Sequence, residues 1–134
     1  MNTIKQTNPE TIEISIVVPV YNERENLVLL DQEITKSIKP LNKNYEVILV
    51  DDGSTDGSSE LIRALQEKNS TIRLIRFGHN HGQTAAFAAG FDKARGDIIV
   101  TMDADLQNSP SDIPLLLTAI KDYDVVCGWR HKRN

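Results

Sequence analysis

Apolar stretches alternate with amphipathic stretches along the whole chain. The apolar stretches are short and rich in β-branched residues, which is typical of strands buried on both faces of a parallel sheet. They predict strands over 14–20, 46–50, 72–77, 97–102 and 124–128. Between these strands, apolar residues recur at the spacing of a helical stripe. This second pattern predicts helices over 25–38, 59–68, 82–94 and 111–121.

Local signals mark the ends of the first predicted helix. Asn22 followed by Glu25 resembles a capping box in front of it, and Pro40 lies beyond its end as a stop signal. A different feature marks the helix over 82–94, which is rich in Ala and Gly. Its side chains have little bulk, so we expect it to pack very close to the sheet or to a ligand.

The alternation of strands and helices predicts an α/β fold. We expect a Rossmann-like, mainly parallel sheet with right-handed crossovers and helices on both faces. The 134 residues fit a single domain. Residues 1–12 are expected to be a flexible lead-in and residues 13–134 to form the domain. The chain stops just after the fifth predicted strand with no helix to close the unit, so we expect the domain to be truncated there.

The chemically suggestive segments each follow a predicted strand. PVYNE follows the first strand, DDGSTDGS the second, GHNHG the third, DADLQ the fourth and GWRHKR the fifth. Ligands of open parallel sheets bind outside the carboxyl ends of the strands. We therefore expect a site at this edge, whereas the opposite edge carries only connectors such as NKNY and ARG.

Carboxylates are concentrated in these loops, which contain Glu23, Asp51, Asp52, Asp56, Asp103 and Asp105. Two carboxylates about 4 Å apart repel by roughly 4 kcal/mol at an effective dielectric constant of about 20. A metal ion is the simplest way to compensate such a cluster. Protonation, hydrogen bonding and solvation are the alternatives.

The segment DADLQ carries the prediction of a metal site. In an extended segment, residues two apart point to the same side, so Asp103 and Asp105 can face one cation. Gln107 continues this alternation and could add a carbonyl ligand. Oxygen ligands of this kind favour Mg²⁺ or Mn²⁺ over Zn²⁺. The alternative is a solvated acidic turn, because D-x-D alone is a common sequence.

Two other loops supply candidate groups for a nucleoside. Asp52, at a strand end, can accept hydrogen bonds from a base N–H or from ribose hydroxyls. Tyr21 offers a ring face for a base, although core packing is the default for a tyrosine taken alone, and Glu23 can accept from base or sugar. Asp51 is expected to support the turn from inside, and Asp56 to serve as a turn and cap residue.

Charge and composition narrow the possible function classes. The net charge is −4 and the pI is about 5.3, so the chain as a whole does not attract a nucleic-acid backbone. An acidic protein that binds an anionic ligand usually does so through a cation. The single cysteine, Cys127, excludes an internal disulfide. We find no signal peptide and no apolar run long enough to span a bilayer. No G-x-G-x-x-G follows a strand, which argues against a dinucleotide-binding domain.

Taken together, the motifs resemble those of the family 2 glycosyltransferases, whose fold is termed GT-A. The matching stretches are IVVPVYNERENL, VILVDDGSTDGS, NHGQTAAFAAGFDKARGD and TMDADLQNSP, in family order over nearly the whole chain. DADLQ together with AFAAGFDKARGD looks like the branch that transfers sugars to polyprenyl or dolichyl phosphate. GWRHKR also resembles that branch.

The resemblance implies a nucleoside pocket and a metal pair. Pro19, Tyr21, Glu23 and Asp52 match the nucleoside pocket of the family. Asp103 and Asp105 match the D-x-D pair that holds the metal on the donor diphosphate, and both would be catalytic through that metal; Asp103 is also implied to touch the ribose. Gln107 matches a position near the metal.

Two further residues complete the expected donor and acceptor sites. Arg130 matches a basic residue near the acceptor phosphate, and its alternative is a solvated tail. Gly82 could let a loop approach the donor closely, and its alternative is simply a glycine at a helix start.

The resemblance implies an inverting transfer of a sugar from a nucleoside-diphosphate sugar to a polyprenyl-phosphate lipid, with Mg²⁺ or Mn²⁺ as cofactor. It places the parent protein at the cytoplasmic face of a membrane, held there through regions missing from this chain, with no nucleic acid as partner. Family members continue into acceptor-binding elements. A non-catalytic nucleotide-sugar-binding module or an inactive fragment therefore remains the alternative.

Overall fold

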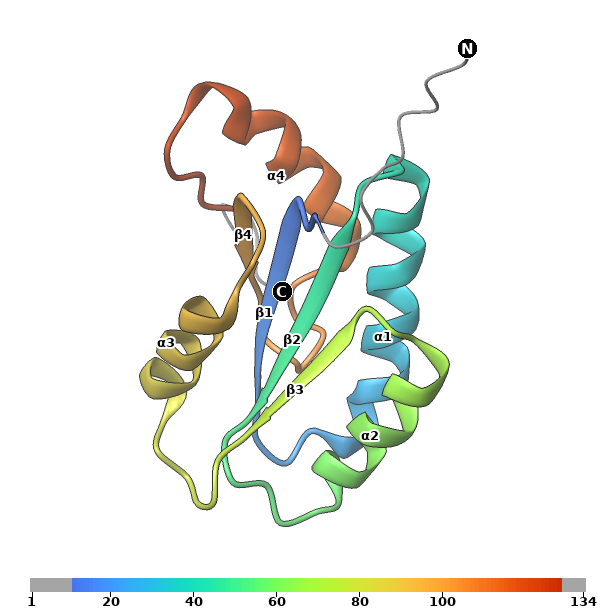
Figure 1. The fold of residues 1–134 in the computed structure, drawn as a ribbon, viewed down its shortest axis with the longest axis vertical. Coiled ribbons are helices and arrows are strands. Elements are labelled where there is room, and N and C mark those ends of the chain that lie inside the picture. The colour runs from blue at the N-terminus through green and yellow to red at the C-terminus, as the bar shows by residue number, and fades with distance from the viewer. Residues whose placement is uncertain (1–10, 129–134) are drawn as a thin grey trace.

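The computed structural model describes residues 11–128, which form three layers (Figure 1). The middle layer is a parallel sheet made of β1 (Ile14–Val20), β2 (Tyr45–Asp51), β3 (Ile72–Arg76) and β4 (Ile98–Thr101). The strand order is β3-β2-β1-β4, so β1 and β2 lie inside the sheet. All residues of β1 but Pro19 are buried, as its continuous apolar sequence predicts. The predicted α/β class and parallel sheet are confirmed.

Helices cover both faces of the sheet (Figure 1). They are α1 (Arg24–Ile38), α2 (Ser58–Lys68), α3 (Gln83–Lys93) and α4 (Ile113–Ala119), with the 3-10 turns η1 (Lys39–Leu41), η2 (Pro110–Asp112) and η3 (Ile120–Asp122). Apolar residues of α1, α2 and α4 pack with Ile16 and Val18 of β1 in one core. Ala86 of α3 packs with Val17 and Ile48 on the opposite face. Successive residues of β1 thus enter different cores, because side chains alternate across a strand.

The Ala- and Gly-rich helix α3 packs very closely on β1, as predicted. A Cβ atom added to Gly90 would collide with Cγ1 of Val17. Ala86, one turn earlier, is fully buried. Small residues on this face therefore determine how closely α3 approaches the sheet.

The predicted fifth strand is wrong. Among the described residues, 124–128 form no strand, and β4 is hydrogen-bonded to β1 alone. Val125 is 76% exposed, so this apolar run lacks the burial on both faces on which the prediction depended. The segment instead lies beside β4, where Phe91, Ile98 and Val126 help to line a shallow apolar groove.

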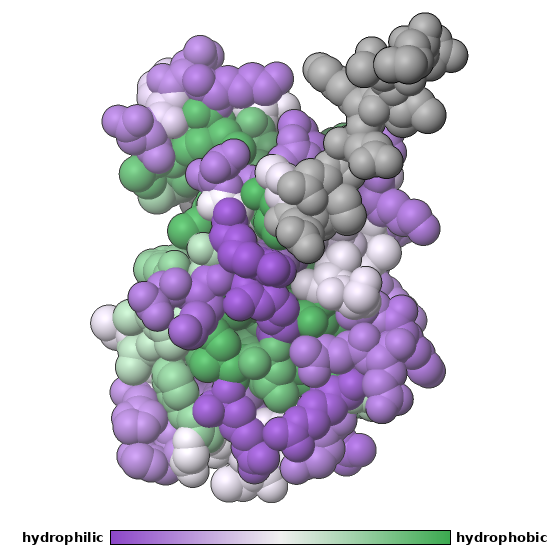
Figure 2. All heavy atoms as spheres, viewed as in Figure 1, coloured by the Kyte–Doolittle hydropathy of each residue, from purple (hydrophilic) through white to green (hydrophobic). Residues whose placement is uncertain are grey.

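The surface reflects this open edge. In Figure 2, apolar side chains gather over α4 and on the α3 side of the sheet, and much of the remaining visible surface is hydrophilic. Large apolar side chains in this region are well exposed, among them Phe91, Ile99 and Leu115. The expected lead-in over 1–12 lies outside the described residues except for its last two positions.

The predicted capping box in front of α1 is also wrong. Asn22 has a positive φ of 51°, and its Oδ1 accepts a hydrogen bond from the backbone N–H of Thr55. The backbone N–H of Arg24, at the start of α1, donates instead to Oδ2 of Asp56 at 3.1 Å. A carboxylate that is distant in sequence therefore replaces the local cap, because the loops after β1 and β2 are packed together.

Pro19 lies within β1, where it pairs in register with Val50 of β2. The ladder between β1 and β4 ends earlier, where the N–H of Met102 donates to the carbonyl of Val17. The nitrogen of Pro19, two residues on, faces that same side beyond the last ladder bond. Its missing N–H therefore breaks no strand pairing.

A buried ionic network fixes the amino-terminal edge of the sheet. Glu46 of β2 is 1% exposed, and its Oε2 accepts hydrogen bonds from Ser15 Oγ at 2.6 Å and from the backbone N–H of Arg95 at 2.7 Å. Its Oε1 accepts from Arg73 at 2.6 Å and from Arg95 Nε at 3.1 Å. Burial alone would raise the pKa of Glu46, but these donors together hold the pKa below its usual value. This edge therefore carries charged groups as well as connectors. These charged groups pair with one another.

Candidate functional site

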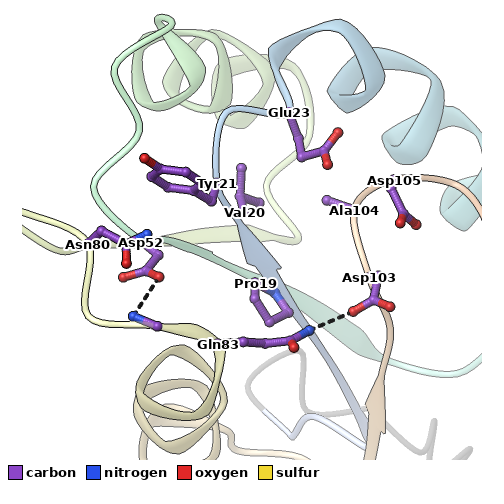
Figure 3. Close-up of a pocket in the computed structure, with 11 residues that line it drawn as sticks. Pro19, Val20, Tyr21, Glu23, Asp52, Asn80, Gln83, Asp103, Ala104 and Asp105 are labelled. Atoms are coloured by element: carbon purple, nitrogen blue, oxygen red, sulfur yellow. Dashed lines mark hydrogen bonds between the residues drawn. The ribbon is translucent and has the colours of Figure 1, made fainter.

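A pocket lies at the carboxyl ends of the strands, beside β1 and β4 (Figure 3). β1 pairs with β2 on one side and with β4 on the other, so the chain winds in opposite directions from this point. Such a switch point is where open α/β sheets bind ligands. The pocket has a volume of about 380 Å³, within the range of small-molecule sites. It is lined by Pro19, Val20, Tyr21, Glu23, Asp52, Asn80, Gly82, Gln83, Asp103, Ala104 and Asp105.

The lining of this pocket is strongly acidic. It contains the carboxylates of Glu23, Asp52, Asp103 and Asp105, and within the described range no Lys or Arg side chain lines it. These four groups come from the loops after three different strands. An anionic ligand could enter such a pocket only together with a cation.

Asp103 and Asp105 are placed by the burial of their neighbours. The N–H of Met102 donates to Val17 of β1, and Met102 and Ala104 are both buried in the core. The intervening Asp103 therefore faces the pocket, and Asp105 follows at its rim. In Figure 3 both side chains lie on the β4 side of the pocket.

One oxygen of each carboxylate is held by a neighbouring N–H group. Oδ1 of Asp103 accepts a hydrogen bond from Gln83 Nε2 at 2.9 Å, drawn as a dashed line in Figure 3. Oδ1 of Asp105 accepts from the backbone N–H of Gln107 at 3.1 Å. The second oxygen of each carboxylate is not used in these bonds and can serve as a hard oxygen ligand.

The extended alternation predicted for DADLQ does not continue to Gln107. The chain turns at 104–105, and Leu106 adopts a positive φ of 64°. A left-handed backbone raises the conformational free energy of a bulky residue. The packing of the Leu106 side chain against the main core offsets this strain. Gln107 therefore does not line the pocket, and its backbone N–H donates a hydrogen bond to Asp105.

Asp52 holds the loop that leads into α3. It is 4% exposed, and its Oδ1 and Oδ2 accept hydrogen bonds from the backbone N–H groups of His81 at 2.6 Å and Gly82 at 2.9 Å. Gly82 has a φ of 97°, so this turn suits glycine. A Cβ atom on Gly53 would collide with the backbone of His79, so the loop also needs glycine beneath it.

Two other aspartates, Asp51 at the end of β2 and Asp56 in the loop after it, have the structural roles predicted for them. Asp51 is 1% exposed and accepts hydrogen bonds from the Ser54 N–H and the Ser59 hydroxyl. Asp56 accepts from the Ser58 hydroxyl and N–H, and from the N–H of Arg24. Slight burial would raise the pKa of Asp56, but the Ser58 and Arg24 donors lower it below its usual value. Both predictions, a turn support and a cap, are confirmed.

The nucleoside candidates lie on the opposite side of the pocket from α3 (Figure 3). Tyr21 is 49% exposed, which excludes the core packing that would be its default. Glu23 precedes α1, and its Oε2 accepts a hydrogen bond from Asn26 Nδ2 at 2.7 Å. With Pro19, these residues form a wall whose ring face and carboxylate remain accessible from the pocket.

Most of the candidate residues from the sequence are thus brought together in this pocket: Pro19, Tyr21, Glu23, Asp52, Gly82, Asp103 and Asp105. Arg130 lies outside the described residues. The sequence interpretation missed Asn80 and Gln83 as lining residues. The available signal was their position after the third strand, with Asn80 in the loop and Gln83 at the start of the Ala-rich helix.

No group of three or more His, Cys, Asp or Glu side chains between residues 11 and 128 is arranged to hold a metal ion. Mg²⁺ is commonly bound by one or two carboxylates together with water and substrate phosphates, without an all-protein cage. The pair Asp103 and Asp105 lies in a pocket that no described Lys or Arg side chain lines, and it fits that kind of site. Across the same residues, no helix has both the length and the apolar character to cross a membrane.

Several named transferases are similar to this chain in sequence. An undecaprenyl-phosphate 4-deoxy-4-formamido-L-arabinose transferase from Aeromonas hydrophila is 48% identical over 122 residues, which are 90% of this chain and 37% of the relative. The enzyme of that name from Proteus mirabilis is 46% identical over 136 residues, covering 99% of this chain and 40% of the relative. The chain therefore spans about two fifths of the length of these relatives.

Solved structures share the fold. The mannosyltransferase PcManGT from Pyrobaculum calidifontis, in complex with GDP-Man and Mn²⁺, superposes with a TM-score of 0.73 at 26% identity, over 85% of this chain and 34% of that one. S. aureus TarS 1-349 in complex with UDP-GlcNAc has a TM-score of 0.69 at 22% identity, over 83% and 31% of the two chains, and supports the fold alone.

The model of one protein family covers nearly the whole chain. Residues 15–134 match the model described as Glycosyl transferase family 2. This match agrees with the motifs at the carboxyl ends of the four strands and with the folds of the solved relatives. The chain therefore belongs to glycosyl transferase family 2.

Proposed function

We propose that this chain is the donor-binding part of an inverting glycosyltransferase that passes a sugar from a nucleoside-diphosphate sugar to a polyprenyl-phosphate lipid. One observation carries the proposal. The pocket at the switch point contains four carboxylates, Asp103 and Asp105 among them, and within the described range no basic side chain. A diphosphate and these carboxylates are compatible only through a divalent cation.

The assignment of the donor is supported by the two halves of the pocket. Tyr21 and Glu23 offer a ring face and an acceptor for the nucleoside. Asp103 and Asp105 would hold Mg²⁺ or Mn²⁺, because each uses Oδ1 in its hydrogen bond to Gln83 or Gln107 and keeps Oδ2 for the cation. The relative PcManGT is described with GDP-Man and Mn²⁺, which is the same combination of ligands.

In the proposed reaction, an acceptor oxygen attacks the anomeric carbon of the donor sugar and the nucleoside diphosphate leaves. When bound, the cation supplies Lewis-acid stabilisation of the negative charge that develops on the leaving diphosphate. Asp103 and Asp105 fix the place of that stabilisation, and Tyr21 and Glu23 orient the nucleoside. Asp52 keeps the α3 loop against the donor side of the pocket.

The acceptor is proposed from the relatives and from its chemistry. The Aeromonas and Proteus relatives are named as transferases to undecaprenyl phosphate. A phosphate acceptor is already an oxyanion near neutral pH, so it needs no strong base in the pocket. Arg130 is proposed to lie near this phosphate, on the match of GWRHKR alone. A lipid acceptor also places the parent protein at the cytoplasmic face of a membrane.

The test compares binding and turnover in the same preparation. GDP and UDP are titrated calorimetrically with and without Mn²⁺, and the matching nucleoside-diphosphate sugars are then assayed for hydrolysis and for transfer to undecaprenyl phosphate. Mn²⁺-dependent binding with transfer supports the proposal. Mn²⁺-dependent binding with neither hydrolysis nor transfer identifies a nucleotide-sugar-binding module or an inactive fragment, and the absence of any Mn²⁺-dependent binding contradicts both.

A further inference from the structure

Gln83 connects the two halves of the pocket. It is the first residue of α3, and its Nε2 donates to Oδ1 of Asp103, which follows β4, at 2.9 Å. In Figure 3 the side chain of Gln83 extends across the floor of the pocket toward Asp103. This bond links the side chains of α3 and the D-x-D segment directly.

The chemistry of the two groups fixes the direction of this bond. An ionised carboxylate only accepts hydrogen bonds, and an amide offers one donor end and one acceptor end. The NH₂ group of Gln83 must therefore face Asp103. An amide also brings no charge, so it can hold the carboxylate without competing with a divalent cation. A lysine or arginine in its place would compete with the cation.

The backbone just before Gln83 is itself held in place. The two preceding residues, His81 and Gly82, donate their backbone N–H groups to the buried carboxylate of Asp52. Gly53 allows this loop to lie directly on the turn after β2. Two hydrogen bonds thus fix the backbone that leads into Gln83, although the Gln83 side chain is exposed.

We propose that Gln83 is a positioning residue that keeps Asp103 in the orientation required for the divalent cation, an inference that rests on the proposed function of the D-x-D pair. The bond to Oδ1 restrains the carboxylate and leaves Oδ2 for the metal. Outer partners of this kind orient metal ligands, and their loss typically weakens metal affinity by about 10- to 100-fold. Because Gln83 is exposed, we expect the lower end, a loss of about tenfold.

The experiment measures Mn²⁺ affinity by the EPR signal of free Mn²⁺ at saturating GDP or UDP, whichever binds. Gln83→Met keeps the length of the side chain and removes the donor. Gln32→Met is the matched control, because Gln32 is an exposed residue of α1 outside the pocket. Asp103→Asn tests the metal assignment itself. Nucleotide affinity without metal and the thermal midpoint are measured for every variant.

The expected result is a fall of about tenfold in Mn²⁺ affinity for Gln83→Met, a larger fall for Asp103→Asn, and no change for Gln32→Met. The thermal midpoint should stay unchanged in Gln83→Met, and metal-free nucleotide affinity should fall by clearly less than Mn²⁺ affinity. If Gln83→Met keeps the wild-type Mn²⁺ affinity while Asp103→Asn loses it, the positioning role of Gln83 is overturned and the metal assignment stands. An equal loss of metal-free nucleotide affinity in Gln83→Met also overturns it. Unchanged Mn²⁺ affinity in Asp103→Asn overturns the proposed function and this inference with it.

Discussion

Oδ2 of Asp52 accepts a hydrogen bond from the backbone N–H of Gly82 at 2.9 Å, which ties the end of β2 to the loop before α3. Its Oδ1 accepts from His81 in the same way. Both oxygens of Asp52 are therefore engaged with the protein itself. The carboxylate can still touch a nucleoside, but its first effect is to fix the backbone of the loop that carries Gln83.

Replacement of Asp52 should therefore affect stability as well as binding. In Asp52→Asn, the NH₂ group faces one of the two N–H donors, and a buried hydrogen bond is lost. We expect a loss of about 1–3 kcal/mol in the free energy of unfolding, measured by urea denaturation. The control is Asp92→Asn, whose carboxylate is 79% exposed. Wild-type stability in Asp52→Asn would show that the carboxylate does not hold the loop.

Asp105→Asn should abolish Mn²⁺-dependent binding of GDP or UDP and leave the fold intact. Asp105 is exposed, and the hydrogen bond that it accepts from the N–H of Gln107 can be kept by the amide oxygen of asparagine. The charge that attracts the cation is lost without a structural cost. Calorimetric titration with and without Mn²⁺ measures the effect, and the thermal midpoint serves as the control. An unchanged effect of Mn²⁺ on affinity would contradict the metal assignment.

Tyr21→Ala should weaken nucleotide binding even when no metal is present. Tyr21 lines the pocket with about half of its surface exposed, so its ring is available for stacking on a base. Aromatic contacts of this kind contribute about 0.5–1.5 kcal/mol, which predicts about a two- to tenfold rise in Kd. Tyr21→Phe keeps the ring and should retain most of the affinity. Equal affinity of the alanine variant and the wild type would remove Tyr21 from the nucleoside site.

The sequence predicted those parts of the structure that depend on periodicity and on strand ends. The continuous apolar run of β1 and the stripe of α1 predicted their elements to within a residue, because burial alone determines them. Strand ends share one edge of a parallel sheet, so the carboxylates of Asp52 and Asp103 could be placed in one pocket without coordinates.

The parts that failed depend on contacts between distant segments. The cap of α1 comes from Asp56, more than thirty residues away, and no local pattern records that bond. The turn at Leu106 has a left-handed backbone in a residue that rarely adopts it, so the extended alternation that the sequence suggested does not continue to Gln107. The run over 124–128 has the composition of a strand, but composition cannot supply the neighbouring strand it would need.

Glu46, at the opposite edge of the sheet, predicts an acid-dependent stability. Glu46→Gln leaves Arg73 and Arg95 without their carboxylate. Both arginine side chains are partly exposed, at 34% and 54%, so water can solvate their charges. We therefore expect the loss typical of hydrogen bonds to a charged group, about 1.5–3 kcal/mol, in urea denaturation at pH 7. The exposed Glu67→Gln is the control and should change stability by less than about 0.5 kcal/mol.

The pH dependence of this difference separates charge from packing. The hydrogen bonds to Glu46 lower its pKa in the folded state, so folding favours the ionised form. Its contribution is therefore complete above the pKa of an unfolded glutamate, about 4.3, and is lost as the pH falls through the lowered folded pKa. Wild type and Glu46→Gln should differ fully at pH 7 and progressively less in the acid range, because a protonated Glu46 resembles a glutamine. A difference that stays constant down to the acid limit would mean that the shape of the side chain, and not its charge, holds Ser15, Arg73 and Arg95 together.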